Sequence, residues 1–319
     1  MRVLAAVLTT LLVWPIASIG QAYPSKPIRL VVPTPPGGSQ DVLARSTGQR
    51  LSELIGQPVI VDNRPGAGGT IAANYVAKSA PDGYTLLVAP LGHYTTQYFF
   101  RNLPFDPHKD FTPVINLVLI PNALVVQNAL PVQSMRELLA YGKANPGRMQ
   151  YGTYAIGSIN HLAGILISQL TGLAMEHVPY KGGAAAVADV LAGQIPIAIV
   201  GASSVLPQAR SGKLRILAVI ENRRFASVPG VPSIAETLGY ALPDSWLGLI
   251  GPAGLPRTIV EQLNAQARSA IHTPEVKRRL ENLGFEVTGN ESAEQFAAAI
   301  GTDTETLGRL IVAAGIRPE

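Results

Sequence analysis

The sequence predicts an α/β fold with mostly parallel strands. From Tyr23 onward, short apolar or β-branched runs alternate with longer segments whose apolar residues recur at helical spacing. This alternation is typical of strands joined by crossover helices. With 47% hydrophobic and 14% charged residues in a chain of 319, one large domain or two ordinary ones can bury a substantial core.

The expected strands are short and rich in Val, Ile, Leu or aromatic residues. The first, Ile28–Val32, reads IRLVV and has the β-branched character of a buried strand. In chain order, the predicted strands are residues 28–32, 58–63, 84–89, 123–127, 149–154, 175–180, 196–201, 214–219 and 247–252.

The expected helices begin at residues that commonly cap a helix. Ser39 is predicted to be an N-cap, because two glycines precede it and apolar residues follow it at helical spacing. Ser134, Ser233 and Ser292 each have Glu or Gln three positions later, which is the spacing of a capping box. Between the strands, we expect helices to begin near Ser39, Thr70, Ser134, Ser158, Ala184, Ser203 and Ser233.

The pattern changes after Pro256. Three helical stretches follow, at 256–272, 274–284 and 293–315, with only 285–289 extended among them. We expect a helical tail that packs on the preceding domain.

The first 22 residues predict an export signal. Arg2 is followed by a short apolar run, and small residues at Gly20 and Ala22 predict cleavage after Ala22. A membrane anchor is the competing interpretation, but the run is short and interrupted by Thr9, Thr10 and Pro15. We expect an exported, soluble mature protein.

Composition excludes several classes of function. The net charge of +4 is spread along the chain without basic runs, which argues against nucleic-acid binding. Because the chain has no cysteine, thiolate metal sites and cysteine nucleophiles are excluded. The five histidines show no metal-ligand spacing, and we expect neither a metal nor a cofactor.

Glycine-rich turns follow several expected strands, at 35–41, 64–70, 155–161 and 180–186. In parallel α/β sheets, such loops gather at one sheet edge, where helix N-termini can bind an anion. None of these loops contains a nucleotide-binding motif: GAGGTI fails GxGxxG at Ile71, and no GxxxxGK[ST] occurs.

An exported hydrolase or lyase that uses Ser158 with His161 is an alternative function. Hydrolase motifs are absent, since GASSV at 201–205 does not complete GxSxG and no histidine lies in HExxH. A ligand-sensing module that contacts a signalling partner is a further alternative. We expect no enzymatic activity.

Many ordered segments resemble the Bug family, the extracytoplasmic solute-binding receptors of tripartite tricarboxylate transport systems. The resemblance runs nearly from end to end. It is carried by YPSKPIRLVVPTPPGGSQDVLAR, GQPVIVDNRPGAGGTIAANYVAKSAPDGYTLLV, GSINHLAG, HVPYKGGAAAVADVLAGQI, SGKLRILAV and PAGLPRTIVEQLN.

This resemblance implies a two-lobed, Venus-flytrap receptor with the type II periplasmic-binding fold. The first lobe would contain residues 23–124 and 246–319, and the second lobe residues 125–245. Family members bind small carboxylates, held mainly by loop amides, hydroxyls and water. The implied ligand is a small organic acid, and the implied partners are the membrane subunits of a tripartite tricarboxylate transporter. We expect a monomer, because such a receptor must present one closed face to its membrane partner.

The implied ligand-binding residues lie on loops of both lobes. Two departures from the family pattern accompany them. Val200 and Gly201 replace a Phe-Asp-like pair, which makes an amino-acid ligand less favoured, and the segment 89–97 brings in His93 and Tyr94. The expected ligand-binding residues are Gly37, Gly38, Ser39, Asp41, His93, Gly157, Ser158, His161, Ala202 and Ser203.

Overall fold

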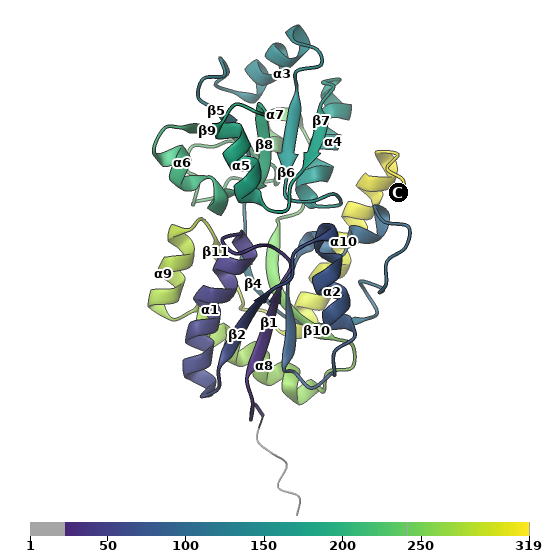
Figure 1. The fold of residues 1–319 in the computed structure, drawn as a ribbon, viewed down its shortest axis with the longest axis vertical. Helices are drawn as coiled ribbons and strands as arrows, with labels where there is room; N and C mark the ends of the chain where they lie inside the picture. Colours follow the sequence, from purple (N-terminus) through teal and green to yellow (C-terminus); the bar gives the residue numbers. More distant parts are fainter. Residues whose placement is uncertain (1–22, 241, 319) are drawn as a thin grey trace, which may run out of the picture.

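The computed structural model describes residues 23–240 and 242–318, so the predicted signal peptide and its cleavage after Ala22 lie outside the described residues. Two sheets form the cores of two lobes, stacked along the long axis of the molecule (Figure 1). We call the lobe built on the six-stranded sheet the first lobe and the lobe built on the five-stranded sheet the second lobe. The expected two-lobed α/β fold is confirmed.

The first lobe contains the beginning and the end of the described chain. Its strands are β1 (Ile28–Val32), β2 (Val59–Asn63), β3 (Thr85–Pro90), β4 (Phe111–Leu119), β10 (Trp246–Pro252) and β11 (Glu286–Val287). Their order in the sheet is β11-β4-β10-β3-β1-β2. β1, β2 and β3 are parallel, whereas β10 runs antiparallel to both β3 and β4. The helices of this lobe are α1 (Ser39–Ile55), α2 (Thr70–Ala77), α8 (Arg257–Ile271), α9 (Pro274–Asn282) and α10 (Ala293–Ala313).

The second lobe repeats this design. Its strands are β5 (Asn122–Gln127), β6 (Gln150–Thr153), β7 (Glu176–Pro179), β8 (Ile197–Gly201) and β9 (Leu214–Val219), in the order β7-β6-β8-β5-β9. β6, β7 and β8 are parallel, and β5 is antiparallel to β8 and β9. Its helices are α3 (Met135–Ala144), α4 (Ile159–Thr171), α5 (Gly183–Leu191), α6 (Leu206–Arg210) and α7 (Ile234–Leu238).

The chain crosses between the sheets twice, once between β4 and β5 and once between β9 and β10. The two crossing segments lie against each other. The Ile120 amide donates to the Ser245 carbonyl oxygen at 2.8 Å, and the Ile220 amide donates to the Asn122 carbonyl oxygen at 3.0 Å. These hydrogen bonds hold the two crossing segments side by side at the junction between the lobes.

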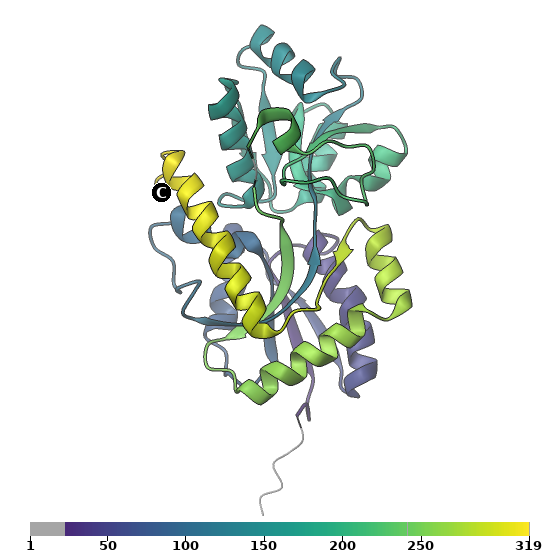
Figure 2. The ribbon, with the colours of Figure 1, turned by 180° about the vertical axis from the view of Figure 1, so that it is seen from behind.

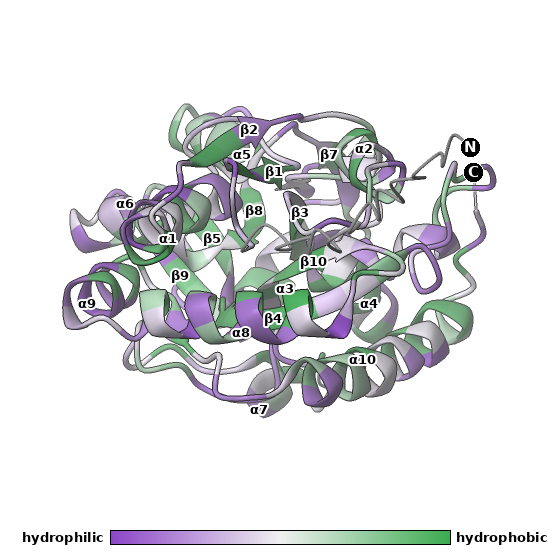
Figure 3. Ribbon diagram, turned by 90° about the horizontal axis from the view of Figure 1, so that it is seen from below, coloured by the Kyte–Doolittle hydropathy of each residue, from purple (hydrophilic) through white to green (hydrophobic). Residues whose placement is uncertain are grey.

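Apolar residues fill both lobes and the junction between them. One buried cluster combines Leu87 and Trp246 of the first sheet with Leu124 and Ile199 of the second. Hydropathy colouring shows hydrophobic central strands, whereas helices such as α8 and α10 carry both hydrophilic and hydrophobic residues (Figure 3). Burial of the apolar helix faces holds the layers together.

The final helix, α10, packs on β4 and α8 of the first lobe. It buries Phe296, Leu307 and Ile311, and its C-terminal end extends towards the second lobe (Figure 2). There, Nε2 of Gln169, in α4, donates to the Ala314 carbonyl oxygen at 2.6 Å. The expected helical tail is confirmed, and it contacts both lobes.

Most predicted helix starts are confirmed, but the predicted N-cap at Ser39 is wrong. Gly38 is the N-cap residue of α1, and no side chain caps this helix. Ser233 and Ser292 form reciprocal capping boxes, whereas Ser134 accepts the Glu137 amide without the return bond. The start expected near Ser203 is a 3-10 turn, Ala202–Ser204, followed by α6.

β4 is absent from the predicted strands, because Pro113 interrupts its apolar run. Proline cannot donate to a sheet and argues against a central strand. In the structure, Pro113 pairs with Ile250 at an irregularity in the β4–β10 register. That irregularity accommodates the proline.

Within residues 23–240 and 242–318, no helix has the length and apolar character needed to span a bilayer.

Candidate functional site

Three adjoining cavities lie where the two lobes meet, and all three are lined by Pro90 of the first lobe and Tyr154 of the second. The first has a volume of about 30 Å³, the second about 250 Å³ and the third about 30 Å³. Thr34 and Gln40 line both the first and second cavities. The shared residues make the three spaces branches of one interlobe cleft.

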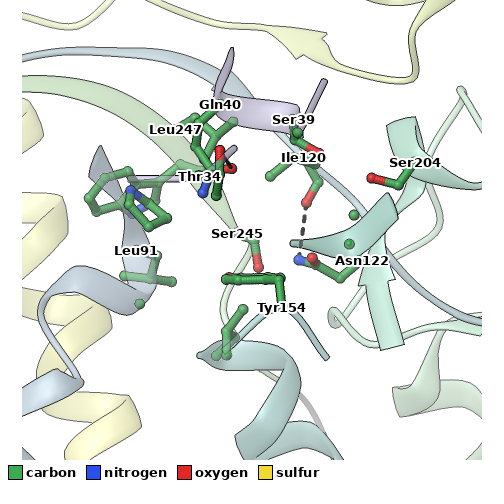
Figure 4. A pocket seen from close by; sticks show the side chains of 17 residues that line it. Thr34, Ser39, Gln40, Leu91, Ile120, Asn122, Tyr154, Ser204, Ser245 and Leu247 are labelled. Atoms are coloured by element: carbon green, nitrogen blue, oxygen red, sulfur yellow. Dashed lines mark hydrogen bonds between the residues drawn. The ribbon is translucent and has the colours of Figure 1, made fainter. Parts of the chain in front are cut away.

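The first cavity is lined by polar residues from three parts of the fold. The loop after β1 and the start of α1 supply Thr34, Gly38, Ser39 and Gln40. The crossing segments and the second lobe supply the remaining polar side chains, which surround the same space in Figure 4. They are Asn122, Tyr154, Ser204 and Ser245.

Helix α1 begins at this cavity. The first backbone N–H groups of a helix have no carbonyl partner within the helix, and the helix dipole makes this end attractive to anions. Because Gly38 provides no side-chain cap, the start of α1 keeps its capacity to bind an anion. A Cβ at Gly38 would lie 2.9 Å from Oγ1 of Thr34, so the loop is closely packed.

The expected ligand residue Asp41 is buried but lines none of the three cavities. Its carboxylate accepts the Gly37 amide at 2.9 Å, the Asn63 side-chain amide at 2.9 Å and Nε of Arg45 at 3.0 Å. Burial raises the pKa of Asp41, but the hydrogen bonds from Arg45, Gly37 and Asn63 outweigh it and hold the pKa below its usual value. In this geometry, Asp41 fixes the β1–α1 loop, and Gly37 takes the positive φ of 85° that the turn requires.

The loop before α4 also uses its polar side chains internally. The Ser158 hydroxyl donates to the Ala155 carbonyl oxygen at 2.8 Å and accepts the His161 backbone amide at 3.1 Å. Nδ1 of His161 accepts the Gly157 amide at 3.3 Å. Gly157 and Ser158 line the third cavity, whereas His161 lines none.

His161 stacks on His177 with 3.9 Å between ring centroids, and the Ser158 hydroxyl is engaged elsewhere. Burial lowers the pKa of His161 to about 4, which leaves its ring neutral near pH 7. The structure therefore holds no Ser158–His161 hydrogen bond between side chains of the kind that activates a serine nucleophile.

His93 lines the third cavity within an aromatic cluster. Its ring stacks on Phe105 at 5.6 Å and meets the edges of Tyr94 and Phe111 at 4.9 and 4.6 Å. Burial lowers the pKa of His93 to about 3, so this side chain is neutral near pH 7. It can contribute a hydrogen bond or packing, but not a positive charge.

Direct contacts join the lobes beside the cavities. The hydroxyls of Ser39 and Ser203 are 2.6 Å apart, and Oγ1 of Thr95 donates to the Gly157 carbonyl oxygen at 3.2 Å. Ser203 therefore joins the lobes without lining any of the three cavities. Ala202 is buried, and its amide donates to the Pro121 carbonyl oxygen at 2.8 Å.

The charge distribution suits an anion. Among the described residues that line the three cavities there is no Asp or Glu, and Lys181, in the second cavity, is the single Lys or Arg. An anionic ligand would therefore meet amides, hydroxyls and one ammonium group. Within residues 23–240 and 242–318, no cluster of His, Asp and Glu side chains could hold a metal ion.

Sequence reasoning missed several residues that line the cleft. Tyr154 is the last residue of the predicted strand 149–154 and comes directly before the glycine-rich turn 155–161. Periodicity does not show which way its ring points. Asn122 and Ser245 sit at the crossings and belong to no distinctive motif. Gln40 lies in the glycine-rich turn 35–41, but it is neither a glycine nor a hydroxyl residue of that turn. Only the interlobe geometry brings these four side chains to one space.

Comparison with known proteins gives a family match over most of the chain. Residues 43–316 match the model of the tripartite tricarboxylate transporter family receptor. The chain is 37% identical to the UPF0065 protein in the tcbD-tcbE intergenic region of Pseudomonas sp. (strain P51), covering 91% of this chain and 87% of the relative. It is 38% identical to protein BugT of Bordetella pertussis (strain Tohama I), covering 80% of this chain and 79% of the relative.

Solved structures agree with this match. R. palustris Rpa4515 with adipate superposes with a TM-score of 0.88 at 35% identity, covering 93% of this chain and all of the other. The periplasmic binding protein BugD gives 0.87 at 30% identity, with 93% and 100% covered. MatC (Rpa3494) from Rhodopseudomonas palustris with bound malate gives 0.84 at 29% identity, with 91% and 100% covered.

Proposed function

This chain belongs to the tripartite tricarboxylate transporter receptor family, and on that premise we propose that it captures a small organic acid between its lobes for delivery to a membrane transporter. The observation that carries the ligand class is the interlobe cleft, which has no acidic lining among the described residues and has the start of α1 at one side. The adipate bound to Rpa4515 and the malate bound to MatC support a carboxylate ligand.

We place the ligand carboxylate in the first cavity, at the start of α1, where the backbone amides of Ser39 and Gln40 have no carbonyl partner within the helix. The Gly38 amide already donates to the Pro35 carbonyl oxygen at 3.2 Å. Hydrogen bonds to a charged acceptor contribute about 1.5–3 kcal/mol each, so a few amides and hydroxyls suffice without an arginine. Tyr154 and Asn122 would complete this end of the site. The rest of the ligand would extend into the larger second cavity, where Lys181 offers a positive charge to a second carboxylate.

Closure of the lobes around the ligand follows from the interlobe contacts. The Ser39–Ser203 and Thr95–Gly157 hydrogen bonds each need both lobes. A ligand that contacts both lobes binds the closed state more tightly and shifts the population towards it.

The bounds of the two moving halves stay a prediction: residues 23–124 with 246–319 form one, and residues 125–245 form the other. The predicted boundary between residues 124 and 125 falls inside β5. The pairing of β5 with β8 begins at Asn122, which favours a crossing just before that residue.

We propose that the protein performs no catalysis on its ligand. The hydroxyl of Ser158 and Nδ1 of His161 each bind their own loop, which leaves the hydrolase alternative without an activated nucleophile.

Exported after cleavage at Ala22, the receptor would act in the periplasm as a monomer that presents its closed form to the membrane subunits. The periplasmic binding protein BugD supports this location.

The test is a calorimetric and thermal-shift panel of adipate, malate, monocarboxylates, aromatic acids and amino acids. An acid at a hundred times its Kd should stabilise the protein by about 2.7 kcal/mol, with no product formed. Gly38→Leu should abolish binding, because its Cβ would press on the Thr34 side chain and distort the loop that shapes the first cavity. Gly301→Leu, at an exposed helical position with open space around it, is the matched control. Turnover of a bound acid would favour the enzyme alternative, and binding of amino acids alone would contradict the proposed ligand class.

A further inference from the structure

A fully buried carboxyl group, that of Glu221, lies where the two crossing segments meet. Glu221 follows β9, on the path from the second sheet back to the first. Its carboxyl accepts the Asn122 backbone amide at 3.1 Å and the Asn122 side-chain amide at 2.9 Å. One carboxyl group therefore ties the second crossing to the first.

The same network reaches the ligand cleft. Oδ1 of Asn122 accepts the side-chain amide of Asn160 at 2.9 Å, and Asn160 lies in the first turn of α4. Asn160 is as deeply buried as Glu221, and Asn122 is only 3% exposed. Asn122 and Ser245 line the first cavity, and both also approach Glu221. A single layer of side chains thus separates Glu221 from the proposed ligand.

The surroundings of Glu221 contain no compensating charge. The neighbouring groups are Asn122 of β5, Ser245 before β10, Tyr154 of the β6–α4 loop and Tyr240 after α7. In the part of the chain that the structure describes, no Lys, Arg or His pairs with Glu221. Arg223, two residues away, pairs instead with Asp244 and Glu286. Burial raises the pKa of Glu221 to about 8, and its hydrogen bonds lower it less.

We propose that Glu221 is a positioning residue that holds the crossing segments together in its neutral form, and that the cleft binds an organic anion with this carboxyl group protonated. This inference rests on the proposed function. An ionised Glu221 would place a second negative charge one side chain away from the ligand carboxylate, in a region of low dielectric where like charges repel strongly. Binding of the anion therefore favours the protonated carboxyl group and takes up a proton when the pH is high.

The experiment measures binding of adipate and malate by calorimetry between pH 6 and pH 9.5, in wild type and Glu221→Gln. Glutamine has the shape of the neutral acid and cannot ionise. In wild type, the affinity should be constant near pH 6 and fall by up to about tenfold per pH unit above pH 8. In Glu221→Gln the affinity should stay near the wild-type value at pH 6 across the whole range.

Proton uptake gives an independent readout. At pH 8.5, the binding enthalpy of wild type should differ between phosphate and Tris, whose ionisation enthalpies differ, and that of Glu221→Gln should not. Glu305→Gln is the matched control, because it removes an exposed carboxylate of α10 that pairs with Arg309 away from the cleft. This variant should keep the pH profile of wild type.

Three outcomes would overturn the inference. Equal pH profiles in wild type and Glu221→Gln, with binding intact, would show that Glu221 does not couple protons to the ligand, while the receptor function stands. Loss of binding in a folded Glu221→Gln would show that the neutral form is not the binding form. If neither acid binds wild type at any pH, the proposed function fails with these ligands, and the coupling fails with it.

Discussion

The hydroxyl groups of Ser39 and Ser203 lie 2.6 Å apart and connect the two lobes at the edge of the first cavity. Ser39 opens α1 of the first lobe, and Ser203 lies in the 3-10 turn that follows β8 of the second. The spacing of apolar residues after Ser39 predicts that its side chain caps its own helix. The structure instead gives it a partner far away in the chain, which makes this pair a direct probe of lobe closure.

We predict that Ser39→Ala and Ser203→Ala each weaken ligand binding, because the hydrogen bond between them requires both lobes. Each loss should be about 0.5–1.5 kcal/mol in binding free energy. The double variant should lose little more than either single variant, since the second substitution removes a bond already broken. Calorimetric titration of all four proteins gives the coupling energy, and strictly additive losses would contradict the contact.

Substitution at Gly92 should separate closure from folding. A Cβ at this position would lie 3.5 Å from the Ile159 amide nitrogen and 3.6 Å from Cα of Ser158, across the lobe boundary. Gly92→Ala should therefore bind ligand nearly as wild type does, whereas the larger side chain of Gly92→Leu should hold the lobes apart. We expect the Leu variant to lose binding and to show a larger radius of gyration by X-ray scattering in the presence of ligand. Unchanged affinity in Gly92→Leu would contradict closure at this boundary.

Asp41→Asn should destabilise the protein near pH 7 by about 1–3 kcal/mol, since a buried carboxylate with charge-assisted hydrogen bonds is lost. The pKa of Asp41 is lowered in the folded state, so its contribution is present above the unfolded pKa and disappears as the pH falls through the folded pKa. The wild type and the variant should therefore converge in strongly acidic solution. Urea unfolding at a series of pH values measures this difference, and a constant difference would contradict the ionised carboxylate.

Glu221→Gln should change stability with the opposite dependence on pH. The pKa of Glu221 is raised from 4.5 to about 8, so its contribution is full below pH 4.5 and is lost as the pH rises towards 8. Over that range, the free energy of unfolding of wild type should fall relative to the variant by up to about 1.4 kcal/mol per pH unit. Ligand-free denaturation curves at pH 4.5, 6, 7 and 8 test this. If the free energy of unfolding of the variant does not rise relative to that of wild type as the pH increases, the carboxyl group is not buried in neutral form.

The sequence by itself determined the fold class, most helix starts and the family. Local spacing carries the fold class and the helix starts, because a helix requires period 3.6, a strand requires period 2 and a cap requires a particular side chain three residues from its partner. The capping boxes at Ser233 and Ser292 are confirmed for this reason. The resemblance to the Bug receptors is confirmed by the family match.

Tertiary structure alone decided how the polar residues are used. Asp41 and His161 looked available in the sequence, but each binds its own loop in the structure. Tyr154 and Asn122 carry no motif, and yet they line the cleft. The partners of Asp41 and His161 lie only four residues away, but these contacts depend on a loop conformation that the residue types alone do not specify. The lining of the cleft depends on which distant segments the two sheets bring together, and no local pattern encodes that. For the same reason, the buried carboxyl of Glu221 at the crossing became visible only in the folded chain.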